Sequence, residues 1–154
     1  MTFGYETIFS RSRLKMNDLK EIMSLSETDM LEINTERLHS VIGNPRVGNI
    51  FSSISLDDDI QEITFDLKNG CGSDLLNKEY VVELLSLGMV ITWLRPQVES
   101  FEYTTMTLGG KEEKLLVNNY KPVIARLDSL ELKLHQMIRD HGYIYNSYLT
   151  EDQS

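Results

Sequence analysis

The sequence predicts a mainly α protein of the α+β class: a helical bundle with one or two short strands and a β-hairpin arm. Three observations favour this class. Apolar residues recur at helical spacing over most of the chain, a stretch near the middle alternates between apolar and polar residues, and a Gly-Gly pair separates two arms of β-forming or polar residues. With 154 residues, the chain has the length of one domain covering residues 1–154.

The composition is that of a folded globular chain with an acidic surface. Hydrophobic residues make up 41 %, charged residues 25 %, and the net charge is −9. No apolar run approaches the ~20 residues of a membrane-spanning helix, so no membrane partner is expected. One cysteine, Cys71, leaves no pair for an internal disulfide and indicates synthesis in a reducing compartment, the cytoplasm.

The charge balance argues against specific nucleic-acid binding, because a protein that holds a phosphate backbone needs a clustered basic face. The nearest candidate cluster is Arg11, Arg13, Lys15 and Lys20, and acidic residues interleave with it. An acidic surface remains compatible with DNA that passes nearby without binding.

Two short helices are predicted in the first third of the chain. The first covers residues 12–25, where apolar residues recur at near-helical spacing. The second begins at a cap formed by Thr28 or Asp29. It ends at Gly43, which suits a left-handed cap, and Pro45 prevents its continuation.

The most strand-like stretch follows. Residues 61–67 alternate cleanly, with apolar side chains on one face and polar side chains on the other. Residues 50–56 alternate more loosely, and the three aspartates at 57–59 make an acidic turn between the two segments. A β-hairpin is predicted, with a helical turn over residues 46–53 as the alternative.

A third helix opens at Ser73, a residue suited to cap it. Over residues 80–94 apolar side chains lie almost all around the helix. The helix must therefore be covered on every side, by its own domain or by another subunit. Pro96 disfavours helix at Arg95, so the helix is expected to stop or kink there. Trp93 is a candidate interface residue.

Residues 101–117 are predicted to form a projecting β-hairpin arm. Phe101, Tyr103 and Met106 lie in a run of aromatic and β-branched residues, and the Gly-Gly pair suits a two-residue turn. The return arm is polar on both faces, so the hairpin has little core of its own. We expect Phe101, Tyr103 and Met106 to contact a partner; the alternative is a hairpin folded flat on its own domain.

The last helix has the most regular pattern. Asn119 can cap it, and Pro122 falls in the first turn, where a missing N–H costs nothing. Apolar residues that include Leu127 and Leu134 follow at alternating spacings of four and three. This seam suits a core-facing bundle helix or a contact between subunits, so Leu127 and Leu134 are also candidate interaction residues.

The motifs support no catalytic residue, cofactor or metal site, and no enzyme is expected. The three histidines are scattered, and a single cysteine does not favour zinc. Asp66 and Lys68, with the aspartates at 57–59 upstream, match the D…(D/E)-x-K arrangement of metal-dependent nucleases, in which carboxylates hold magnesium. Residues of such common types are weak support, and the acidic surface opposes this interpretation.

Two segments resemble a known family: residues 51–60 (FSSISLDDDI) and residues 84–98 (LLSLGMVITWLRPQV). With the hairpin and helix that follow, they resemble small neck proteins of tailed bacteriophages of Gram-positive hosts, the head–tail connector or adaptor class. The resemblance covers residues 46–145 and consists of hydrophobic patterns. It implies an α-rich subunit with extended loops or hairpins, which stacks as a ring beneath the portal around the DNA channel and has no chemical site.

The resemblance implies a structural protein of the virion neck, synthesised in the host cytoplasm. Its partners would be copies of itself in a ring and the portal and tail-side neck proteins, while DNA would pass through an acidic channel. Two other functions stay open. One is a small cytoplasmic protein-binding or regulatory module, dimeric through residues 80–94 or the last helix, and the other is a metal-dependent nuclease.

Overall fold

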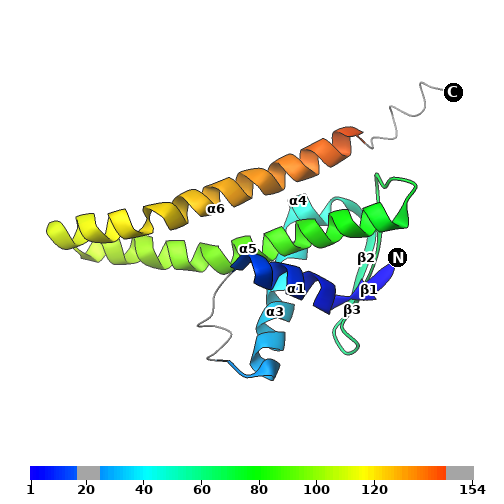
Figure 1. Ribbon diagram of the computed structural model, residues 1–154, viewed down its shortest axis with the longest axis horizontal. Coiled ribbons are helices and arrows are strands. Elements are labelled where there is room, and N and C mark those ends of the chain that lie inside the picture. The colour runs from blue at the N-terminus through cyan, green and yellow to red at the C-terminus, as the bar shows by residue number, and fades with distance from the viewer. Residues whose placement is uncertain (17–24, 145–154) are drawn as a thin grey trace.

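The computed structural model describes residues 1–16 and 25–144. Helices dominate these residues and a small antiparallel sheet accompanies them, which confirms the predicted mainly α (α+β) class. In Figure 1, α5 (Asp74–Thr107) and α6 (Lys111–Ile144) run side by side as a long helical hairpin. α1 (Tyr5–Met16) and α3 (Glu27–Ile42) lie on the other side of α5 from α6, and the tip of the hairpin extends past them.

The first helix begins earlier than predicted. α1 starts at Tyr5, directly after strand β1 (Thr2–Gly4), and not near residue 12. Its buried side chains include Tyr5, Ile8 and Phe9, which lie on one face at helical spacing and pack into the core. Aromatic residues are only moderate helix formers, so tertiary burial determines this start. The predicted continuation over residues 17–24 lies outside the described residues.

The second helix has the predicted C-terminal boundary, but its N-cap residue and the conformation of its C-cap differ from the prediction. Ser26 caps α3 by accepting a hydrogen bond from the Asp29 backbone N–H at 3.2 Å, so the cap is neither of the two predicted residues. Gly43 is the C-cap as predicted, but its φ of −67° is right-handed and not left-handed. A short helix, α4 (Pro45–Gly48), follows, so the helical-turn alternative holds only for this part of the segment.

The predicted β-hairpin at the acidic turn is confirmed. β2 (Phe51–Asp57) and β3 (Glu62–Leu67) pair antiparallel, and β1 adds to the other edge of β3 to give the order β1-β3-β2. Ile63 and Phe65 are buried, whereas the alternating polar residues of β3 are exposed. The sheet therefore presents one apolar face to the core, as the period of two predicts.

α5 is the centre of the core. Ser73 caps it as predicted. Residues 81–91 are buried on all sides of the helix apart from Glu83, because α1, α3 and α6 pack around it. By length and composition α5 could cross a membrane, but 67 % of its apolar window is buried inside the protein, which accounts for that composition. Pro96 does not end the helix: Val98 and Phe101 remain buried beyond it, and their packing outweighs the local cost of proline.

The predicted β-hairpin over residues 101–117 is wrong. α5 continues to Thr107 and α6 begins at Lys111, so both arms are helical and residues 108–110 form the turn, with Gly110 at φ +72°. Two helices satisfy their own backbone hydrogen bonds, whereas an isolated strand pair is marginal in water. The last helix therefore starts well before Asn119, and Pro122 lies inside it.

Candidate interaction surface

Three side-chain contacts join α5 and α6 from the base of the hairpin towards its tip. At the base, the rings of Tyr80 and His141 stack with centroids 3.8 Å apart. In the middle, the Arg95 guanidinium donates to a carboxylate oxygen of Glu131 at 2.7 Å. Nearer the tip, the rings of Phe101 and Tyr120 stack at 4.6 Å. The two helices are thus held together up to Phe101.

The turn end of the α5–α6 hairpin projects past the other described elements (Figure 1). We call residues 102–117 the arm. Three of its apolar side chains are exposed by more than half: Tyr103 by 73 %, Met106 by 84 % and Leu115 by 64 %. Single exposed apolar residues are ordinary, but these three lie at one end of one hairpin, where contact with another protein would bury them.

Two hollows adjoin the base of the arm. The first has a volume of about 390 Å³ and lies between α5 and α6, where Phe101 and Tyr120 line it. The second, of about 680 Å³, lies between α3 and α5, and we call it the α3–α5 groove. Its walls combine charged and apolar side chains: Glu32, Ile33, Glu36, Arg37, Thr92, Trp93, Pro96 and Gln97.

The six predicted interaction residues, Trp93 among them, lie in three different surroundings. Phe101, Leu127 and Leu134 are buried within the hairpin, so they join α5 to α6 and are not free for a partner. Tyr103 and Met106 are exposed on the arm.

Trp93 is half-buried and lines the α3–α5 groove, while the Arg126 guanidinium lies 5.9 Å from its ring centroid. Leu115 was missed because the return arm was interpreted as a strand. With helical spacing, Leu115 and Tyr120 separate onto different faces of α6.

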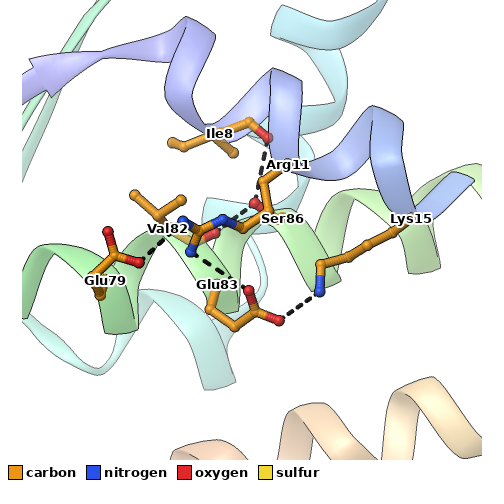
Figure 2. A network of polar contacts seen from close by, with 7 residues as sticks. All are labelled: Ile8, Arg11, Lys15, Glu79, Val82, Glu83 and Ser86. Atoms are coloured by element: carbon orange, nitrogen blue, oxygen red, sulfur yellow. Dashed lines mark hydrogen bonds and ion pairs between the residues drawn. The ribbon is translucent and has the colours of Figure 1, made fainter.

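The basic residues near the N-terminus do not form a free basic patch. Figure 2 shows Arg11 reaching Glu79 and Glu83 at 3.0 and 3.6 Å, and Lys15 reaching Glu83 at 2.5 Å. Burial alone would raise the pKa of Glu83, but the hydrogen bond and charge of Lys15, with the charge of Arg11, lower it below its usual value. These ion pairs fasten α1 to α5. Arg13 pairs with Glu6, and Lys20 lies outside the described residues.

A second polar cluster joins α1, α3 and the turn between β2 and β3. The Tyr5 hydroxyl donates to Asp58 at 2.6 Å, and His39 Nε2 lies 2.9 Å from both oxygens of the same carboxylate. Burial, followed by the hydrogen bond to Asp58, raises the pKa of Tyr5, so Tyr5 keeps its proton. The hydrogen bonds from Tyr5 and His39 lower the pKa of Asp58. A tyrosine that retains its proton is a poor base, and this cluster is arranged to hold the turn in place.

The carboxylates of the nuclease hypothesis are not brought together. Asp57 pairs with Glu62 at the turn end of the β2–β3 hairpin, whereas Asp66 lies opposite Ser53 at the other end. Four residues of strand separate the two ends, about 13 Å, which is too far for one shared metal ion. Among residues 1–16 and 25–144, no group of three or more His, Cys, Asp or Glu side chains is arranged to hold a metal.

Comparison with known protein families, curated proteins and solved structures found no match to this chain.

Proposed function

We propose that this chain is a structural assembly subunit, a ring-forming head–tail connector or adaptor of a phage neck that surrounds the DNA channel. The observation that carries the proposal is the arm: a helical hairpin that leaves its own body and presents Tyr103, Met106 and Leu115 to solvent. Such a projection buries little of its own surface, and contact with a neighbouring subunit would cover it.

Two further features agree with this function. The core helix α5 and the α1–α5 ion pairs build a body that is independent of the arm, as an assembly subunit that docks through a projection requires. The net charge of −9 also suits a surface along which DNA slides without binding. The partners under this proposal are copies of the same chain and the portal and tail-side neck proteins, in the virion.

The test replaces the three most exposed apolar residues of the arm with a polar residue of good helix propensity: Tyr103→Gln, Met106→Gln and Leu115→Gln in one chain. The matched control is Leu14→Gln, Leu75→Gln and Leu132→Gln, which are helical residues at least 58 % exposed but outside the arm. Sedimentation velocity and electron microscopy of the purified chains measure assembly, and circular dichroism measures folding.

The arm variant is expected to keep the helical signal and unfolding midpoint of the wild type while losing ring-sized assemblies, and the control is expected to assemble normally. Rings that form equally well with the arm variant would refute the proposal. A small oligomer that tolerates the arm variant would instead favour the alternative function, a cytoplasmic protein-binding or regulatory module.

A further inference from the structure

We infer that the arm of one copy docks into the α3–α5 groove of the next copy, with lysines of α6 facing glutamates of α3. The inference rests on the proposed function, because it identifies the surface on a neighbouring subunit that receives the arm. Four observations carry it: a lysine row that runs along α6 from the arm to Lys121, an acidic rim on the groove, their matched spacing, and their separation within one chain.

The lysine row lies on the outer face of α6. Lys114 and Lys121 are seven residues apart, so helical geometry places them on the same face, and Lys111 lies one turn before Lys114. All three are exposed, and that face is turned away from Tyr120, which packs on α5. No ion pair found between the described residues involves them.

The acidic rim belongs to α3. Glu32 and Glu36 line the α3–α5 groove, and Asp29 extends the row by one turn towards the start of the helix. These carboxylates are exposed and also lack ion-pair partners within the described part of the chain. Arg37 contributes one positive charge to the same groove, so the acidic residues outnumber the basic one.

The two rows match in length. Asp29 and Glu36 are seven residues apart, like Lys114 and Lys121, and both separations correspond to about 10.5 Å along a helix. Two helices lying side by side can therefore bring both lysines opposite both acids. The groove also has apolar walls, with Ile33, Trp93 and Pro96, while Leu115 lies next to the lysine row. The contact would thus bury apolar surface as well as pair charges.

One chain cannot make this contact with itself. In Figure 1 the arm and α3 extend from α5 in different directions, and α3 and α6 lie on different sides of α5. The arm and the groove are different surfaces, so a contact between them joins copies head to tail. A head-to-tail contact produces a ring when its rotation closes. Because each copy carries a charge of −9, general repulsion opposes association, and local charge complementarity must overcome it.

The test is a charge swap. Lys114→Glu with Lys121→Glu, and separately Asp29→Lys with Glu36→Lys, should each weaken self-association by about tenfold or more, since like charges then face each other. Association should return towards the wild-type level in a single chain that carries all four substitutions, because opposite charges then face each other again. The matched control for the lysine variant, Arg46→Glu with Lys68→Glu, makes the same change of net charge at exposed residues outside both surfaces.

A second measurement locates the contact directly. A carbodiimide couples lysine amines to carboxylates that touch, and mixing ¹⁴N and ¹⁵N chains identifies the links between copies by mass spectrometry. Links from Lys114 or Lys121 to Asp29, Glu32 or Glu36 of another copy are expected, and they should decline as salt screens the pairs.

The outcomes separate the inference from the proposed function. If the four-change protein stays as weak as its parents, or if intermolecular links join other residues, the groove is not the receiving surface. Loss of rings in the arm variant would still support an assembly subunit in that case. A wild-type chain that remains monomeric without intermolecular links would refute both.

Discussion

Gly88 controls how closely α3 can pack against α5, and its replacement gives the sharpest test of the core. A Cβ atom added at Gly88 would lie 2.5 Å from Cγ1 and 3.1 Å from Cγ2 of Val41. Carbon atoms in contact prefer about 3.5–4.0 Å, so the first distance is about 1 Å too short. Val41 cannot easily turn aside, because it is buried and a β-branched residue in a helix has one strongly preferred rotamer.

We therefore expect Gly88→Ala to destabilise the protein. Overpacking costs up to about 3 kcal/mol, and the higher helix propensity of alanine returns about 1 kcal/mol. The net loss is about 2 kcal/mol, which lowers Tm by roughly 4–8 °C for a chain of this size. Urea unfolding followed by circular dichroism and by Trp93 fluorescence measures the loss, and coincident transitions check two-state behaviour.

Two variants serve as controls. Gly142→Ala lies in α6 with open space around the added atom, so it should be neutral or slightly stabilising. Val41→Ala with Gly88→Ala removes the obstructing methyl groups, so the double variant should lose less stability than the sum of its parents. A Gly88→Ala protein as stable as the wild type, or strict additivity in the double variant, would show that α3 and α5 do not meet at Gly88 as described.

Three further predictions concern stability. Leu84→Asp should lower the free energy of unfolding by several kcal/mol in the same urea experiment, because it leaves an unpaired charge at a fully buried position of α5. A variant as stable as the wild type would show that α5 is not buried on all sides. Burial lowers the pKa of His141 from 6.5 in the folded state, so the unfolded state binds the proton more readily. Stability should fall as pH drops below about 6.5, and His141→Gln should flatten that part of the pH profile. The pKa of Asp58 is lower in the folded state than its unfolded value of 3.8. The contribution of Asp58 to folding stability is therefore fully present above pH 3.8 and is lost as the pH falls through the folded-state pKa. Asp58→Asn should reduce stability at neutral pH and weaken the acid dependence; an unchanged acid limb would contradict the Tyr5–Asp58–His39 cluster.

Where local pattern and tertiary packing agree, the sequence predicts the structure. The alternation in β3 matches its burial because one face of the sheet meets the core. Ser73 caps α5 through a local hydrogen bond that depends on few other residues. The apolar belt at residues 80–94 needs cover on all sides in any fold, and α1, α3 and α6 provide it.

The prediction fails where distant contacts decide the local conformation. The run from Phe101 to Thr107 has β-forming residues, but the stack of Phe101 on Tyr120 keeps it helical. The same contact explains why α6 begins before Asn119, since Tyr120 must already be on a helix that faces α5. The lysine row and Leu115 become visible only after this helix is known, because strand spacing distributes them over both faces. The arm was thus predicted as a projection, but its facing residues could not be identified from spacing alone.

Pro96 and Pro122, the prolines of the α5–α6 hairpin, bear on the proposed function. Pro96 lies twelve residues before Leu108 and Pro122 twelve residues after Gly110, so they lie at about the same level of the antiparallel hairpin. Each proline removes one backbone hydrogen bond from its helix and disturbs the preceding turn. Both helices are therefore weakened where the hairpin leaves the body, and beyond that level few contacts other than the Phe101–Tyr120 stack hold it. Segments with few buried contacts open at lower free energy than the core. Under the proposed function, we therefore expect the arm to adjust its angle to a neighbouring copy at this level without disturbing α1, α3 or the sheet.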